Sequence, residues 1–382
     1  MADIDKAINV EEQIDLQIRN RTKGMDVEVD VTEENPEMDS FEQMEDGSIA
    51  FGDTLPSIED PEDFYANLAD LMEDSDINSV KNDLMSNVDS DKESRSDWEK
   101  TYKEGLEYLG MKYEERSQPF EGASGVMHPL LAESVTQFQA QAYNELLPSQ
   151  GPVKTQVLGV TTPDTEGQAS RVQEFMNYQL MQVMKEYDPE TDQMLFYLPL
   201  SGSAFRKVYY DQNLGRAVSK FIPSEDLIVP YAATDLHSAT RITHVINMSM
   251  NDIRKSQQTG FYSDVDIDSG NMTAEDLDGI QEGIDDLQGV SPDYSDDDTC
   301  KVHEIHTELD MPGFEDLDDE GEETGIKLPY IVTIGNNKVL AIRRNYKEDD
   351  QLKQRINYFV HYKFLPGLGF YGFGLTHMIG GL

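Results

Sequence analysis

The segment that decides the fold is LSGSAFRKVYYDQNLGRAVSKFIPSEDLIVPY, which covers residues 200–231. Apolar and polar side chains alternate in three short stretches of it, and this period of two is typical of β-strands that bury one face. We expect strands at 204–210, 216–222 and 227–229. Turn residues at 211–215 lie between the first two strands, so the segment predicts a β-hairpin followed by a third strand.

Upstream of the hairpin, apolar residues recur every three to four positions, which predicts helices. The first predicted helix begins near residue 96, the second covers 129–148, and the third runs from 165 to 188. A short apolar helix follows at 194–200. The side chains expected on the buried faces of the three longer helices are Trp98, Tyr102, Leu106 and Leu109; Leu131, Val135, Phe138, Ala142 and Leu146; and Val172, Met176, Leu180, Val183 and Tyr187.

Downstream of the hairpin, the period of two returns, interrupted by two predicted helices. Ser249 and Asp252 form a predicted capping box for a helix that ends near Gln258. A narrow apolar stripe predicts another helix at 277–287. Runs of helices and runs of strands together predict an α+β fold. The predicted strands lie at 241–248, 300–309, 330–334, 339–343 and 356–364, and the third and fourth form a hairpin that turns at 335–337.

The formal net charge of −45 is concentrated in two acidic blocks. Residues 1–90 hold 26 acidic and 5 basic side chains, and residues 256–325 hold 23 acidic side chains and one basic side chain. The remaining residues, 91–255 and 326–382, hold 26 acidic and 24 basic side chains. A nearly neutral body with two acidic inserts argues against salt adaptation, which would acidify the whole surface. It also argues against a protein that reads DNA through a basic face.

The first acidic block is expected to be largely disordered, because its apolar residues are too few to offset the entropy of ordering. We therefore expect order to begin near Ser96, after a tail that either solubilises the protein or binds a partner. The sequence contains neither a signal peptide nor a run of about 18 apolar residues, so we expect no membrane-spanning segment. The single cysteine, Cys300, excludes a disulfide framework and a zinc site built from cysteines.

Two patterns resemble ligand sites, and each lacks a feature that its ligand requires. The glycines at 367, 369 and 372 fit the spacing GxGxxG, but bulky residues stand between them, so we expect structural glycines at a strand-to-helix turn. Asp264, Asp266, Asp268 and Glu275 fit a calcium loop, but Ser269 stands at the sixth position, which requires glycine. A solvated acidic loop is therefore expected there.

Histidine and serine patterns do not predict catalysis either. His303 and His306 lie three apart on a predicted strand and so point to opposite faces. Ser124 lacks the spacing of a nucleophile elbow, and we expect Ser201 and Ser203 to belong to a tight helix-to-strand turn. The sequence therefore predicts a protein that is not an enzyme, with no catalytic, cofactor-binding or metal-binding residues and no cofactor.

Four segments, in this order, resemble the portal proteins of tailed double-stranded DNA bacteriophages, the head-tail connectors. The resemblance lies in a Gly/Ser-rich turn before a glutamine-bearing helix, the small-residue turn and hairpin quoted above, a strand followed by a helix, and the run Gly-Phe-Tyr-Gly-x-Gly-Leu. The segments cover residues 120–148, 200–231, 241–262 and 359–382. The chain resembles the N-terminal portion of such a protein, since its last apolar residues look like the start of a longer helix.

The resemblance implies a ring, usually of twelve subunits, at one capsid vertex, with double-stranded DNA passing non-specifically through its channel. By family order, 1–95 is the acidic N-terminal segment, 96–248 a wing-like α+β domain, and 249–299 a stem-like helix with an acidic insert. Residues 300–364 correspond to a clip-like β-rich region, and 365–382 to the start of a second stem helix.

Partners and location also follow from the resemblance alone. It implies contacts with other copies of the chain, the terminase large subunit, head-tail adaptor proteins, and the major capsid or scaffolding protein, with no membrane partner. It places the protein in the virion, and in the host cytoplasm during assembly. Carboxylates of the second acidic block would then either line the channel, where they repel DNA over about 8–10 Å, or face outward toward a basic partner.

A different class of function is an acidic interaction protein that mimics DNA and binds basic partners without catalysis. Such a protein needs acidity across a folded surface. The nearly equal numbers of acidic and basic side chains outside the two blocks argue against this alternative.

Overall fold

The chain separates into two compact units, residues 1–57 and 58–382. The first unit contains strands β1 (Phe41–Gln43) and β2 (Ile49–Phe51), which pair antiparallel. Beyond the backbone of these strands, the computed structural model describes residues 64–109, 129–211, 214–267, 299–317 and 322–379.

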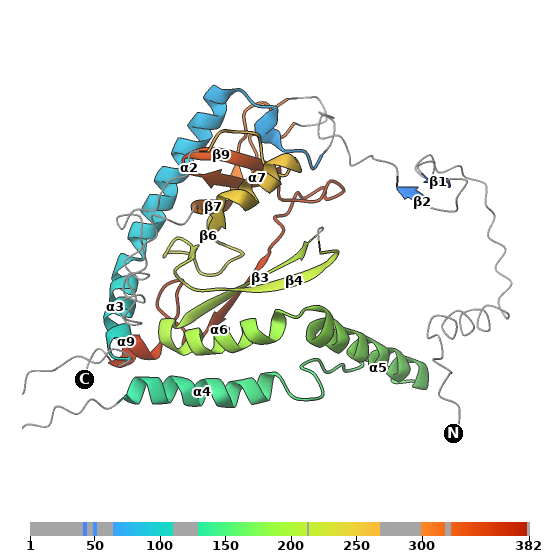
Figure 1. The fold of residues 1–382 in the computed structure, drawn as a ribbon, viewed down its shortest axis with the longest axis vertical. Helices are drawn as coiled ribbons and strands as arrows, with labels where there is room; N and C mark the ends of the chain where they lie inside the picture. Colours follow the sequence, from blue (N-terminus) through green and yellow to red (C-terminus); the bar gives the residue numbers. More distant parts are fainter. Residues whose placement is uncertain are drawn as a thin grey trace, which may run out of the picture. The chain divides into compact units, whose positions relative to one another are not determined.

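The second unit is mixed α and β, with helices beside two antiparallel sheets (Figure 1). Its α-helices in the described residues are α2 (Asp74–Ser94), α3 (Ser96–Glu107), α4 (Leu130–Leu146), α5 (Pro163–Tyr178), α6 (Tyr187–Ser201), α7 (Met250–Gln258) and α9 (Leu375–Ile379). A 3₁₀ turn, η1 (Leu68–Asp70), precedes α2, and a π-helical turn, η2 (Gln179–Val183), lies between α5 and α6.

The strands of the central and C-terminal parts of the chain form these two sheets. The smaller sheet has the strand order β10-β3-β4, and the larger has the order β5-β6-β7-β8-β9. The strands are β3 (Ser203–Asp211), β4 (Arg216–Ile222), β5 (Leu227–Ile228), β6 (Arg241–Ser249), β7 (Thr299–Leu309), β8 (Leu328–Gly335), β9 (Lys338–Arg344) and β10 (Phe359–Lys363).

Most predicted strands coincide with observed strands to within one or two residues, which confirms the mixed α and β class. The strand predicted at 216–222 is β4. The β8–β9 hairpin turns at Asn336 and Asn337, whose φ angles of 44° and 62° suit a type I′ turn. The Oγ atom of Ser249 accepts the backbone N–H of Asp252 at 3.1 Å, which confirms the predicted cap of α7.

Order begins earlier than the predicted boundary near Ser96. Helix α2 carries Leu84 and Val88 on one face, and both are buried in a cluster with strands β8 and β9. Asp91 of α2 also pairs with Arg241 of β6 at 2.7 Å. The expectation that 1–95 is largely disordered is therefore wrong for 74–94, because a narrow apolar stripe anchors a helix that is otherwise highly charged.

The segment 165–188, predicted as one helix, is divided into several elements in the structure. It consists of α5, the turn η2 and the start of α6, and Pro189 lies in the first turn of α6, where a missing N–H is tolerated. The short helix predicted at 194–200 is the second half of α6. The expected burial of Val172 and Met176 is wrong, since they are 50% and 45% exposed.

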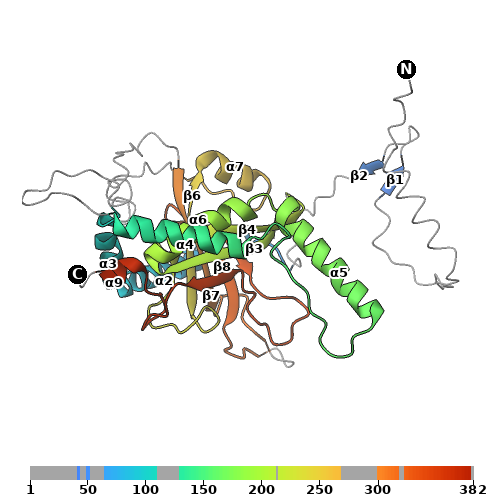
Figure 2. The ribbon, with the colours of Figure 1, turned by 90° about the horizontal axis from the view of Figure 1, so that it is seen from below.

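The predicted buried face of 129–148 is confirmed except at its end, and Ala142 packs on the same cluster as Phe138. Leu131 and Val135 of α4 are buried, and Phe138 packs against the cluster around α6. Leu146 is 51% exposed, so the prediction is wrong for this residue. Helices α4 and α6 lie side by side in both views (Figures 1 and 2).

The strands of 300–364 do not form a sheet of their own. Strand β7 pairs with β6, and β10 pairs with β3, so each sheet combines strands from 96–248 and from 300–364. The boundary that we expected at 249–299 therefore does not separate two β-structures in the described residues. Pairing between strands far apart in the sequence is decided by the tertiary fold, which periodicity does not report.

Some predictions fall outside the described residues. These are the helix at 277–287, Ser124, and the second half of the suspected calcium loop from Asp268 onward.

The position of α2 in the core can be tested by substitution. Leu84→Ala is expected to lower the free energy of unfolding by about 2–5 kcal/mol, because it leaves a cavity among buried side chains. Asp83→Ala, at the adjacent exposed position, is the control and should change it by less than about 0.5 kcal/mol. Urea unfolding measures both values. Equal stabilities would mean that α2 does not pack on the sheet.

Candidate functional site

Two glycine-bearing turns, far apart in the chain, lie against each other. Helix α6 ends in the first turn, and α9 begins after the second. Gly202 in the first turn has a φ of 80°, and a Cβ there would lie 2.3 Å from the backbone nitrogen of Gly374. A Cβ on Gly372 would lie 2.3 Å from the carbonyl oxygen of Gly202. Glycine is therefore needed on both sides for the two backbones to approach.

Hydrogen bonds join the same two turns, which we call the glycine junction (201–205 and 367–376). The backbone N–H of Gly372 donates to Oγ of Ser203 at 2.7 Å. The hydroxyl of Thr376 donates to the carbonyl oxygen of Leu200 at 2.7 Å. The first turn of α9 is thus attached to the end of α6.

Trp98 of α3 packs against one side of the glycine junction. Its ring stacks on Tyr371, with ring centroids 4.7 Å apart, and on His377 of α9, with centroids 5.6 Å apart. Its Nε1–H donates to the carbonyl oxygen of Gly372 at 3.2 Å. One side chain of α3 therefore contacts both the turn and the helix that follows it.

Arg95, between α2 and α3, connects the junction to the larger sheet. Its buried guanidinium donates to the carbonyl oxygens of Glu225 and Leu227 at 2.7 and 2.9 Å, and to the hydroxyl of Tyr371 at 3.0 Å. Its Nε atom pairs with Glu99 at 2.6 Å. The buried charge is thus surrounded by acceptors, which offset the cost of removing it from water.

Ser203 and His361 form a pair that superficially resembles a nucleophile and its base. The Nε2 atom of His361 lies 3.1 Å from Oγ of Ser203, and the imidazole stacks on Phe205 and Phe370. Burial, followed by the nearby charge of Lys363, lowers the pKa of His361 to about 3. Ser203 has no exposed surface, and Ser201 donates to its carbonyl oxygen. Both serines lie in the helix-to-strand turn, as predicted.

The glycines of the GxGxxG pattern also lie in the turn that was predicted. A Cβ on Gly367 would lie 2.0 Å from the carbonyl oxygen of Tyr371, and one on Gly369 would lie 2.4 Å from the ring of Tyr231. Protein atoms occupy the places where a pyrophosphate would have to approach these backbones. The sequence predicted the turn. It placed Trp98 on a buried helical face but did not indicate that Trp98 contacts this turn, because a single tryptophan on a helical face looks like any core residue.

A partly buried group of charged side chains connects the two sheets. Lys207 of β3 donates to both carboxylate oxygens of Glu304 on β7, at 2.6 and 2.7 Å. His306 lies on the same face of β7, with Nε2 2.7 Å from Glu304. His303 lies on the other face, as the spacing of three predicts. No sequence pattern indicated this group, because its members lie on different strands.

The surroundings of this group set its charge state. Burial opposes ionisation of Glu304, but the charge of Lys207 and the hydrogen bond from His306 outweigh it, and the pKa of Glu304 lies well below its usual value. Burial, followed by the charge of Lys207, lowers the pKa of His244 to about 3. Among the described residues, none supplies a hydrogen-bond partner to the buried Nδ1 atom of His244. The result is one partly buried ion pair beside two imidazoles whose pKa values are lowered.

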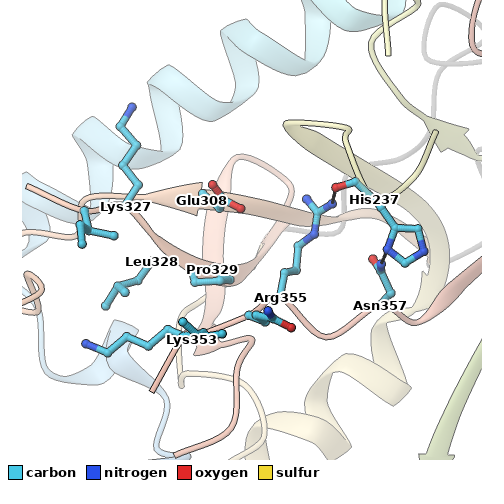
Figure 3. A pocket seen from close by; sticks show the side chains of 11 residues that line it. His237, Glu308, Lys327, Leu328, Pro329, Lys353, Arg355 and Asn357 are labelled. Atoms are coloured by element: carbon cyan, nitrogen blue, oxygen red, sulfur yellow. Dashed lines mark hydrogen bonds between the residues drawn. The ribbon is translucent and has the colours of Figure 1, made fainter. Parts of the chain in front are cut away.

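A shallow cavity of about 370 Å³ lies elsewhere on the larger sheet (Figure 3). The guanidinium of Arg355 in its wall donates to the carbonyl oxygens of Ala239 and His237 at 2.8 and 3.0 Å, and Asn357 contacts the His237 ring at 2.6 Å. These polar groups are engaged by the protein itself. The cavity is lined by His237, Glu308, Ile326, Lys327, Leu328, Pro329, Leu352, Lys353, Gln354, Arg355 and Asn357.

Metal-binding patterns find no support in the described part of the chain. There, no three His, Cys, Asp or Glu side chains gather as a metal site requires. The backbone carbonyl of Asp266, from the suspected calcium loop, instead accepts a hydrogen bond from Lys338. Among the described helices, none combines the length and apolar character needed to cross a membrane.

Comparisons with known proteins do not assign the chain to a family. No protein-family model matches it, and no curated protein matches it either. The glycine junction is the best-defined candidate site, because two turns that are far apart in the sequence meet there and fix the start of α9.

The close approach at the glycine junction predicts a large effect of one methyl group. Gly372→Ala should lower the free energy of unfolding by about 2–4 kcal/mol, because the added Cβ collides with backbone atoms. Gly167→Ala, in exposed α5 where the nearest atom is 3.5 Å away, should instead raise it by about 0.5–1 kcal/mol. Thermal or urea unfolding distinguishes the two. A neutral Gly372→Ala would refute the close approach.

The lowered pKa of His361 predicts acid sensitivity. The unfolded chain binds a proton near pH 6.5 but the folded chain only near pH 3, so this residue's stabilisation is complete above pH 6.5 and is lost as the pH falls toward 3. In that window His361 contributes a slope of up to about 1.4 kcal/mol per pH unit. His361→Phe should flatten the dependence by that amount, measured by urea unfolding across the window. An unchanged slope would show that His361 titrates normally.

Proposed function

We propose that the chain is a structural subunit of a phage portal ring, through which double-stranded DNA enters and leaves the capsid. The observation that supports this most directly is the glycine junction. Two segments that resemble portal proteins, 200–231 and 359–382, are distant in sequence but pack through their glycines in the folded chain. A chance similarity in two unrelated loops would not require such contact.

The junction also gives the proposal a physical role for those residues. The helix α9 begins directly after the second turn, and its orientation is set by Trp98, Leu200 and Thr376. In a portal subunit this helix would start the second stem segment. A rigid junction at the start of this helix would hold the stem of every subunit at the same angle, which a closed ring requires.

The charge distribution is compatible with a passive conduit. Binding of DNA depends on Lys and Arg contacts to phosphate, and a channel that held phosphates tightly would oppose passage. In the described body, several basic side chains are already used within the protein, as Arg95, Lys207 and Arg241 show. We propose no catalytic role, and we propose terminase, head-tail adaptors and the capsid or scaffolding protein as partners in the virion.

Assembly of the purified full-length gene product tests the proposal. We expect a closed ring with an axial opening in electron micrographs and a mass of many subunits by light scattering. We also expect weak retention of duplex DNA at physiological salt, because a chain with a net charge of −45 repels phosphate. A full-length product that stays monomeric, or that forms no closed ring, would refute the proposed function.

A further inference from the structure

Helix α5 exposes its apolar side chains and uses its polar side chains for contacts within the chain. Val172, Phe175 and Met176 are 50%, 62% and 45% exposed. They lie at i, i+3 and i+4, so they form one continuous stripe along the helix. We call these three residues the α5 ridge. A surface helix ordinarily turns such a stripe toward the core.

The polar side of α5 is the side that the chain covers. Asn177 exchanges two hydrogen bonds with the backbone of Val153, at 2.9 and 3.1 Å. Thr155 donates to the carbonyl oxygen of Ala169 at 2.9 Å. The extended segment before α5 therefore lies along its polar stripe, and the α5 ridge remains open to solvent.

The helix is well formed despite this arrangement. Thr162 and Thr165 form a complete capping box at its start, and Pro163 occupies its first turn. A 16-residue helix with no buried residue has little tertiary packing to hold it, since an isolated helix of this length is marginal in water. A well-formed helix with an exposed apolar stripe indicates a surface on which a partner protein packs.

Charge argues that the partner is another copy of this chain. Two chains of net charge −45 repel each other, so a stable contact between copies needs a neutral, apolar surface. Residues 151–185 hold three acidic and three basic side chains, and so carry no net charge. A strongly basic partner would be drawn to the acidic blocks and not to this segment.

Three further large apolar side chains are exposed at the far end of the same helical layer. Tyr108, Leu130 and Met378 are 51%, 58% and 51% exposed, and they belong to the ends of α3, α4 and α9. Figures 1 and 2 both show α5 at one end of α4 and α6, and α3 and α9 at the other. Different exposed apolar side chains at opposite ends suit a head-to-tail contact, which generates rings when the rotation closes.

We propose that the α5 ridge of one copy packs on the α3–α4–α9 end of a neighbouring copy. The inference rests on the proposed ring, because it names the surfaces through which adjacent subunits meet. It also places the α5 contact next to the glycine junction of the neighbour, since Met378 lies two residues after Thr376 in α9.

Cross-linking between two variants tests the proposal directly. Met176→Cys and Met378→Cys chains with different tags are coexpressed as the full-length product and treated with a short bismaleimide. The native Cys300 is buried, so the introduced thiols are the reactive ones. We expect a covalent product that carries both tags, and at most a tenth as much product from either variant alone. Product from Met176→Cys alone would indicate a symmetric α5–α5 contact and overturn the proposal, as would no product.

Matched substitutions on α5 supply a second measurement. Phe175→Asp places a carboxylate on the ridge and should weaken the assembly. We expect it to dissociate into monomers at protein concentrations at least tenfold higher than those at which the wild type dissociates, as measured by sedimentation velocity. Ser170→Asp adds the same charge on the side away from the ridge and should leave assembly unchanged. If Phe175→Asp rings form normally, this inference fails while the portal proposal stands. If the two-tag cross-link forms without a closed ring, the portal proposal fails and the contact stands.

Discussion

The close approach of the backbones at Gly202 and Gly372 is the constraint on which the remaining structure depends. A turn that ends α6 and a turn that precedes α9 touch without side chains between them. Because Trp98 stacks on the second turn, α3 is drawn into the same contact. Arg95 then extends it to the larger sheet through buried carbonyl oxygens. Helices from the start, middle and end of the second unit therefore share one small region.

The pairing of Lys207 with Glu304 plays a comparable role between the two sheets. Two desolvated charges are costly to bury, and their attraction repays that cost only when the remaining polar atoms are satisfied. Glu304 meets this condition through Lys207 and His306. The pair links a strand of the smaller sheet to a strand of the larger sheet, and both side chains are largely withdrawn from solvent. The same burial keeps the neighbouring His244 neutral.

The glycine junction and the α5 ridge suit different tasks in an assembly. The junction is rigid and buried, so it can transmit the orientation of a subunit body into α9. The ridge is exposed and apolar, and it lies in a segment without net charge. In the proposed ring, the first would set the angle of each subunit and the second would hold its neighbour, while the acidic blocks keep unrelated surfaces apart through repulsion.

Periodicity along the chain determined the local elements: the strands around 204–222, the cap of α7 at Ser249 and the helix that carries Trp98 all follow from neighbours in sequence. Three things did not follow. Helix α2 was hidden by its charge, because a stripe as narrow as that of Leu84 and Val88 is weak against many carboxylates. The exposure of α5 and the meeting of Gly202 with Gly372 were decided only by tertiary structure. Which face is covered, and which distant turns touch, depends on packing between elements, and a pattern of residues along one element does not contain that information.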